Sequence, residues 1–485
     1  MTRKIQLPAL ACLMMVCLMA GPQLAELTES EKIADFTTEC IYENEVGSVT
    51  GARFRHTGSG FVLDFMRIQS VPQAFVWVNT HPVSDQGEPH TLEHLLLGKG
   101  TKGKYVASLE SMRLGSSSAF TQQLRTCYHF NTTAGTDVFY ELFEAKLDAM
   151  LHPNFSDEEI RREVMNIGVT EDPMTGKKRL EEKGTVYSEM VSSFEKPWGD
   201  LYLELGRMLY GYGHPLSYSS GGYPPEIRRM IIRDIREFHA STHHLNNMGA
   251  VVAMPNDISL EDCLGEFSRI LNLVEPGAVA SGHPEDKLFD LPPAASGLTG
   301  TLKQVSFPHQ NENEPGLMVF AWPADLELDA KSAYLMDLFL TNLASGQTSN
   351  LYRKFIDSQT RDMDVGATGI WSWRSDEPGN PVYINLNNVN RQSSSKEKMA
   401  EIRSEIQGEI SRIAALPADS EELAGFNDRA KNLIIQQRRD LRDFLNSPPG
   451  FGTRGTGSGW MSHLNQLHRE GGFHRSLARN DILDY

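Results

Sequence analysis

Two histidines and a glutamate stand at a spacing that suits a metal site. His90, Glu93 and His94 lie in the stretch Gly87-Glu-Pro-His-Thr-Leu-Glu-His. Residues four apart on a helix share one face, so His90 and His94 can offer two imidazole nitrogens to a single zinc ion while Glu93 borders that face. A carboxylate beside the metal can take a proton from water that the ion has made more acidic. The HxxEH spacing therefore predicts hydrolysis at a zinc centre.

The residues on either side of the motif predict that it lies on a helix. Pro89 suits a first helical turn, an apolar run continues through Leu97, and Gly98 can end the helix. The competing interpretation is that surface histidines and a glutamate share a helix by chance. A third ligand would decide between the two, because a catalytic zinc usually has three protein ligands and a water.

The elements around the motif predict an α+β fold. Short apolar runs broken by turn residues predict antiparallel strands between Val49 and Thr80, and two more strands are predicted between residues 116 and 131. Ser156 and Glu159 form a capping box that opens a helix. Apolar spacing predicts another helix from Leu180 to Phe194. An antiparallel sheet with helices gathered beside it is typical of α+β domains.

The chain divides into segments by composition and pattern. Gly, Pro, Ala and Ser are frequent between Glu275 and Gly300, which predicts a linker. After it a similar order of strands and helices returns, beginning with a strand predicted at Lys303 to Phe307, so we expect an internal duplication with one metal site. The expected segments are a signal peptide at 1–25, the metal-binding domain at 26–273, the linker at 274–300, a homologous second domain without a metal site at 301–440, and the start of a helical hairpin at 441–485.

Composition bounds the partners. The 485 residues are 40% hydrophobic and 22% charged, which is ordinary for globular proteins. The formal net charge is −17 and no run of Lys or Arg forms a stripe, which argues against nucleic acid and anionic membranes as partners. After residue 25 only Cys40, Cys127 and Cys263 remain, without a CxxC pattern. They are interpreted as one disulfide with a spare thiol or as three buried free cysteines.

The N-terminus predicts export. Met1 to Lys4 is short and basic, and Leu7 to Ala20 is apolar, as in a signal peptide. The apolar run is short for a membrane-spanning helix, which needs about 20 residues, so no membrane span is expected in the mature chain. The residues around Cys12 and Cys17 do not favour a lipid anchor. We therefore expect a periplasmic or extracellular protein.

A glutamate far along the chain completes a family pattern. Glu189 stands in Gly184-Thr-Val-Tyr-Ser-Glu-Met-Val, and with the HxxEH motif it makes the chain resemble the pitrilysin and insulin-degrading zinc peptidases, the inverzincins. The closest resemblance is to the N-terminal half of their presequence-protease branch. The resemblance runs from about Glu43 to Asn446. It includes Ser220-Gly-Gly-Tyr-Pro and Gly346-Gln-Thr-Ser-Asn-Leu-Tyr-Arg-Lys.

The resemblance implies a role for particular residues. His90, His94 and Glu189 would bind one Zn²⁺ per chain, and Glu93 would be the general base that activates water for attack on a peptide carbonyl. Glu182, two helical turns before Glu189, would be a carboxylate that orients a ligand, unless it belongs to a solvated helix face. An extended peptide would add a strand along Ser118, Ala119, Phe120 and Thr121, unless this strand lies inside the sheet.

The chain also departs from the family. Ser118 stands where relatives usually have an asparagine, which removes an amide contact to substrate. Relatives of this branch resemble two such halves joined by a helical hairpin, and this chain stops within that hairpin. We therefore expect peptide substrates and full activity that depends on a C-terminal half. Either the chain is a fragment of a longer protein, or a separate subunit supplies that half, or two copies of the chain pair. The alternative is a non-catalytic half that binds peptide or a partner subunit.

Overall fold

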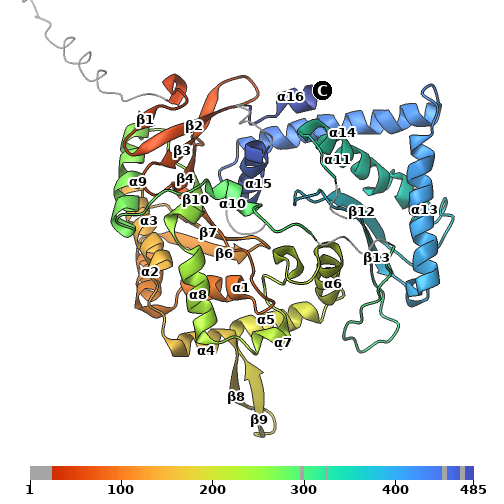
Figure 1. Cartoon of the computed structure of the whole chain (residues 1–485), viewed down its shortest axis with the longest axis horizontal. Helices are drawn as coiled ribbons and strands as arrows, with labels where there is room; N and C mark the ends of the chain where they lie inside the picture. The colour runs from red at the N-terminus through yellow and green to blue at the C-terminus, as the bar shows by residue number, and fades with distance from the viewer. Residues whose placement is uncertain (1–23, 295–299, 323–325, 450–455, 470–475) are drawn as a thin grey trace, which may run out of the picture.

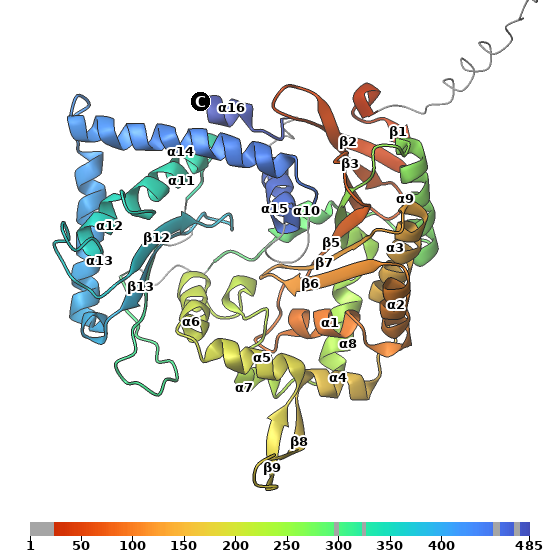
Figure 2. The same cartoon turned by 180° about the vertical axis from the view of Figure 1, so that it is seen from behind.

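The structure, a computed structural model, describes residues 24–294, 300–322, 326–449, 456–469 and 476–485 (Figure 1). The signal peptide predicted at residues 1–25 therefore lies almost wholly outside the described residues. Within these ranges, no helix combines the length and the apolar character that crossing a bilayer requires. Figures 1 and 2 show two sheet-and-helix assemblies side by side, with α14 (Glu421–Leu445) running from the second towards the first.

An eight-stranded sheet forms the centre of the first assembly. Its strand order is β1-β2-β3-β4-β10-β5-β7-β6, and every neighbouring pair is antiparallel except β10 with β4. The strands are β1 (Lys32–Ile33), β2 (Phe36–Glu43), β3 (Val49–His56), β4 (Val62–Met66), β5 (Gln73–Asn79), β6 (Gly115–Thr121), β7 (Arg125–Thr132) and β10 (Met248–Ala253). Among the described residues β6 pairs with β7 alone, so β6 is an edge strand.

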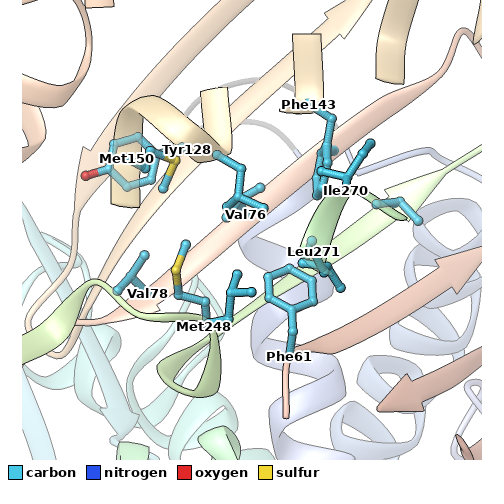
Figure 3. Packing of buried hydrophobic residues seen from close by; sticks show 14 of the residues in the cluster. Phe61, Val76, Val78, Tyr128, Phe143, Met150, Met248, Ile270 and Leu271 are labelled. Carbon is cyan, nitrogen blue, oxygen red and sulfur yellow. The ribbon is translucent and has the colours of Figure 1, made fainter. Parts of the chain in front are cut away.

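The middle of this sheet is covered on both faces. In β5, Ala74, Val76 and Val78 pack into a core under the helices, whereas Phe75 and Trp77 pack into a core on the opposite face. Successive side chains of a strand point to opposite faces, so a strand buried on both sides is apolar throughout, as β5 and β10 nearly are. Figure 3 shows the helix-side core, where Val76 of the sheet meets Phe143 and Ile270 of the covering helices.

Helices of the first assembly cover one face of the sheet or flank it. They are α1 (Glu88–Leu96), α2 (Gly100–Met112), α3 (Thr136–Leu151), α4 (Asp157–Val164), α5 (Thr185–Phe194), α6 (Gly199–Tyr210), α7 (Pro224–Ile227), α8 (Ile232–Thr242) and α9 (Leu260–Val274). The predicted capping box is present, because Ser156 accepts from the backbone N–H of Glu159 and Glu159 accepts from that of Ser156. A two-stranded hairpin, β8 (Asn166–Glu171) with β9 (Lys178–Lys183), projects between α4 and α5 (Figure 1).

The second assembly is smaller and antiparallel. Its sheet has the order β11-β13-β12, from β11 (Gly316–Trp322), β12 (Gly369–Arg374) and β13 (Val382–Val389). One face packs on α11 (Ala330–Ala344), α12 (Asn350–Phe355), α13 (Lys396–Ala414) and the start of α14. Tyr383 and Trp373 on the other face pack with Tyr210 of the first assembly, and the Tyr210 hydroxyl donates to Glu377 Oε2 at 2.6 Å. The predicted α+β class, with antiparallel sheets packed on helices, is confirmed.

The predicted helix from Leu180 to Phe194 is wrong in its first turn. Residues 178–183 form β9, and the helix begins only at Thr185. Gly184, between them, has a φ of 138° and its Cα lies so near the chain of α4 that a Cβ would come 2.4 Å from the carbonyl oxygen of Val164. The chain turns sharply there, and apolar spacing alone did not reveal it.

Part of the predicted linker is folded into the first assembly. Residues 284–288 form α10 (Pro284–Leu288), and the carboxylate of Glu285 is buried between Arg53 at 3.3 Å and Arg125 at 2.5 Å. A second pair joins Arg53 Nε to Asp64 at 2.7 Å. Composition indicated a linker because it describes only neighbouring residues. The arginines that pair with Glu285 come from distant strands. The outer boundaries of 274–300 stay predictions.

One further segment differs from expectation. Residues 303–307 form no strand, and the second sheet begins with β11. The helical hairpin whose start was predicted at 441–485 stays a prediction; after α14, α15 (Thr456–Arg469) returns to the first assembly. Its Trp460 and Leu464 pack on Trp77 in the core on the far face of the large sheet. The cysteines at 40, 127 and 263 are all free and buried, as in the second of the two interpretations.

Candidate metal centre

Helix α1 holds the two histidines in place. It begins after Gly87, in the left-handed region with a φ of 80°, and Pro89 lies in its first turn. Its leucines pack into the helix-side core and fix its rotation. A Cβ on Gly87 would stand 2.6 Å from the carbonyl oxygen of Gly221, so the segment around Gly221 lies directly against the start of α1.

Each histidine has an acceptor for its Nδ1–H. His90 Nδ1 donates to the carbonyl oxygen of Gly221 at 3.2 Å, and His94 Nδ1 donates to Glu163 Oε1 at 3.0 Å. A carbonyl or an ionised carboxylate can only accept, so both rings carry their proton on Nδ1. Each Nε2 is thereby left with its lone pair free to bind a metal.

The two Nε2 atoms and a carboxylate oxygen converge. His90 Nε2 and His94 Nε2 are 3.1 Å apart, and Glu189 Oε2, from α5, lies 3.8 Å and 3.5 Å from them. Zinc bound tetrahedrally at 2.0–2.1 Å holds its donor atoms about 3.3 Å apart. Two lone pairs facing each other at this distance repel unless a cation lies between them. The three residues therefore fit a zinc ion by donor type, distance and tautomer.

Glu163 contacts one of the two histidines and was not predicted from the sequence. It is buried on α4 and accepts from His94 while pairing with Lys99 at 2.9 Å. Burial alone would raise the pKa of Glu163, but hydrogen bonds from His94, Lys99 and Thr185 lower the pKa to about 2. A signal existed in the sequence, because Glu163 shares the apolar face of α4 with Ile160 and is an acid where a hydrophobe is expected.

Glu93 lies beside the histidines without joining their cluster. Its side chain is buried, and its Oε2 accepts from the hydroxyl of Thr121 at 2.8 Å. Burial raises the pKa of Glu93, whereas the Thr121 hydrogen bond and His94 oppose the rise. A carboxylate with a raised pKa and a fixed orientation is suited to accept a proton.

Thr121 connects this site to the edge strand β6. The backbone N–H of Gln122 donates to the carbonyl of Arg125 at 2.7 Å, which fixes the phase of the β6–β7 ladder. Antiparallel pairs alternate, so Ser118 and Phe120 point their backbone groups at β7, whereas Ala119 and Thr121 point theirs away from the sheet. Of the predicted peptide-binding residues, Ala119 and Thr121 thus direct their backbone N–H and C=O groups away from the sheet. The side chain of Phe120 packs on the core of the opposite face, which contains Phe75 and Trp77.

Glu182 does not occupy the place that the sequence predicted. It belongs to β9, and its Oε2 accepts from Tyr187 and from Arg228 at 2.7 Å. Among the printed contacts of the described ranges it makes none with His90, His94 or Glu189. The expected place of Glu182 on the helix of Glu189 is wrong because the chain turns at Gly184. A role in orienting a ligand stays a prediction, and it is Glu163 that contacts His94.

A second cluster, His283, Asp286 and His468, also brings possible ligand atoms together. The chemistry of His283 argues against a metal here. Its Nδ1 accepts the backbone N–H of Glu285 at 3.2 Å, so its proton is on Nε2, which donates to Glu39 at 3.0 Å. The two imidazoles are stacked at 4.7 Å rather than aimed at a common point. This cluster fastens α15 to α10.

No protein-family model matches the chain. An uncharacterised protein of Saccharomyces cerevisiae is 28% identical over 287 residues, 58% of this chain and 26% of the relative. The mitochondrial presequence protease of Gibberella zeae is 28% identical over 338 residues, 68% of this chain and 32% of the relative. The chain thus spans about a third or less of the length of these relatives.

Solved structures share the fold. A domain titled peptidase M16 inactive domain, from Pseudomonas fluorescens, superposes with a TM-score of 0.61 at 14% identity. The superposition covers 89% of this chain and 90% of that domain's chain. Pitrilysin superposes with a TM-score of 0.53 at 15% identity, and the superposition covers 93% of this chain and 43% of the pitrilysin chain. Sequence relatives named presequence protease and this shared fold agree with the predicted resemblance. The chain is related to the pitrilysin family of M16 peptidases.

Proposed function

We propose that the chain is a zinc metalloendopeptidase that hydrolyses peptide bonds in unfolded peptides. Its relatives' names support a peptidase in general. The observation that carries the finer proposal is the convergence of two histidine lone pairs and the Glu189 carboxylate beside Glu93, at the end of an open strand edge. Such a combination supplies both a metal site and a place for an extended substrate.

In this proposal each residue has a separate task. His90, His94 and Glu189 hold the zinc ion, with Gly221 and Glu163 keeping the rings in the binding tautomer. When bound, zinc would supply Lewis acidity that makes water and a peptide carbonyl more reactive. Glu93, oriented by Thr121, takes the proton from the attacking water and passes it to the departing amine.

Cleavage of an unstructured peptide by the purified chain tests the proposal. We expect cleavage in the presence of zinc, its loss with a chelator, and its return when zinc is restored, each followed by mass spectrometry of the products. If the folded, zinc-loaded chain left the peptide intact, the proposed activity of this chain would be wrong. The rate per chain, followed against chain concentration, tests the predicted homodimer, because a dimer-dependent rate rises with concentration.

Strand addition makes its own prediction. In Ala119→Pro the substitution removes a backbone N–H that points outward, so the β7 ladder is kept while the peptide loses a hydrogen bond and meets the proline ring. One hydrogen bond contributes about 0.5–1.5 kcal/mol, so its loss alone should lower kcat/KM by about 2- to 10-fold, and the steric conflict with the proline ring lowers it further. Steady-state kinetics on a fluorogenic peptide, with zinc content as a second readout, measures this.

Ser118→Pro is the matched control. Its N–H points at β7, so the substitution should break the ladder and lower the melting temperature instead of acting selectively on kinetics. Wild-type kinetics in a folded Ala119→Pro variant would contradict substrate binding along β6.

A further inference from the structure

The helix that carries Glu189 is fastened by few directional contacts. Helix α5 begins after Gly184 without a side-chain cap. Its Thr185 hydroxyl contacts Glu163, which ties the first residue of the helix to α4. Glu189 itself is 57% exposed, so neighbouring side chains do not clamp it. The position of the Glu189 carboxylate therefore depends on how the body of α5 is held.

One face of α5 lies on the segment from Gly221 to Arg228. Met190 packs on Gly221, since a Cβ there would stand 2.8 Å from the Met190 Cε. Phe194 meets Tyr223 edge to face at a centroid distance of 5.1 Å. These two contacts are apolar, so they hold the helices together without fixing how far α5 slides or turns. Tyr187, one turn before Met190, makes the contact that is directional.

Arg228 and the hydroxyl of Tyr187 make that contact. Arg228 Nη2 lies 2.5 Å from the Tyr187 hydroxyl and 2.7 Å from Glu182 Oε2, and the Tyr187 hydroxyl also donates to Glu182. The guanidinium carbon stands 5.2 Å from the centre of the Tyr187 ring. The ring is buried in the helix-side core, so the hydroxyl cannot move without α5. Glu182, which accepts from both Arg228 and Tyr187, belongs to the β8–β9 hairpin.

We propose that Arg228 is a positioning residue for the metal centre, acting through Tyr187 to set the place of Glu189. The inference rests on the proposed zinc site. Arg228 follows α7, and α7 follows the Gly221 whose carbonyl orients His90. The segment from Gly221 to Arg228 thereby sets the orientation of the His90 ring directly and the position of the Glu189 carboxylate through α5. The Glu182–Arg228 pair is about 40% exposed, and such pairs contribute little to global stability, so replacing Arg228 should leave folding nearly unchanged.

Zinc affinity, measured by competition with a fluorescent chelator, tests the inference. Residues that orient metal ligands typically change metal affinity by about 10- to 100-fold, and Arg228→Ala, acting one contact further away, should weaken zinc binding by about 10-fold. Tyr187→Phe removes only the hydroxyl and should act in the same direction. Arg228→Lys should restore part of the affinity, because an ammonium can reach one of the two oxygens but not both. The melting temperature of the apo chain should hardly change.

A double-mutant cycle with Glu189→Ala makes the test specific. If Arg228 acts through Glu189, then Arg228→Ala has no further effect on zinc affinity in the Glu189→Ala background. An equal loss in both backgrounds, or no loss in the wild-type background, would overturn the inference. Arg229→Ala is the matched control, because Arg229 is exposed and pairs with Glu226. If the wild-type chain itself bound no zinc, the metal site would fail and the inference with it.

Discussion

Replacing Glu93 by glutamine should lower peptide cleavage by about two to four orders of magnitude while zinc stays bound. The amide keeps the size of the side chain and can still accept from Thr121, but it cannot take a proton from water. General-base catalysis contributes about 10²- to 10⁴-fold, so kcat should fall by that factor with little change in KM. Steady-state kinetics with metal analysis of the same sample measures both quantities.

The same variant separates the enzyme from a non-catalytic binding half. Glu93 lies outside the cluster of donor atoms, so a chain that only binds peptide or a partner would lose nothing in Glu93→Gln. Glu158→Gln, on an exposed position of α4, controls for a change of charge alone. Turnover at the wild-type rate in Glu93→Gln would show that another group is the base.

Replacing Glu285 by glutamine should destabilise the first assembly strongly. The carboxylate is buried between Arg53 and Arg125, and its loss removes a negative charge from both buried guanidinium groups. Breaking a buried ion pair by removing one partner costs about 3–5 kcal/mol in the free energy of unfolding. Denaturant titration of wild type and variant measures the difference. Asp286→Asn, at the neighbouring position that is 71% exposed, should cost far less.

The loss of stability caused by Glu285→Gln should become smaller in acid. Burial alone would raise the pKa of Glu285, but Arg125 and Arg53 lower it below the ordinary value of 4.5. A carboxyl group whose pKa is lower in the folded state stabilises above its unfolded pKa, and this stabilisation disappears as the pH falls through the folded pKa. The difference between wild type and Glu285→Gln should therefore be constant at neutral pH and shrink below about pH 4.5. A difference that grew in acid would contradict the ion-pair explanation.

The parts of the site that sequence predicted are those encoded by local spacing. His90 and His94 lie four apart on a helix, and the helix geometry alone brings their nitrogens together. Glu189 needed a resemblance, because no local rule connects it with residues so far away in the chain. The edge position of β6 was likewise an expectation from the family that the strand order then bore out.

The parts that sequence missed depend on contacts between distant segments. Glu163 and Glu285 are both buried acids whose cationic or imidazole partners come from other elements, so Glu163 was not singled out and composition placed Glu285 in a linker. Glu182 was misplaced because a single sharp turn at Gly184 converts one expected helix into a strand and a helix. In each case the deciding interaction is non-local, and a pattern in one window cannot contain it.

The insertion of β10 between β4 and β5 has a consequence for how the protein is made. In the part of the chain that the structure describes, strands β1 to β4 join strands β5 to β7 within the sheet only through β10, which is synthesised long after them. Pairing between strands that are far apart in the sequence is intrinsically slow. A ribosome must therefore release the chain past Ala253 before the sheet can close. Until then α1, with its histidines, and α5, with its glutamate, have no completed sheet to pack on. Metal binding should therefore follow sheet closure rather than precede it.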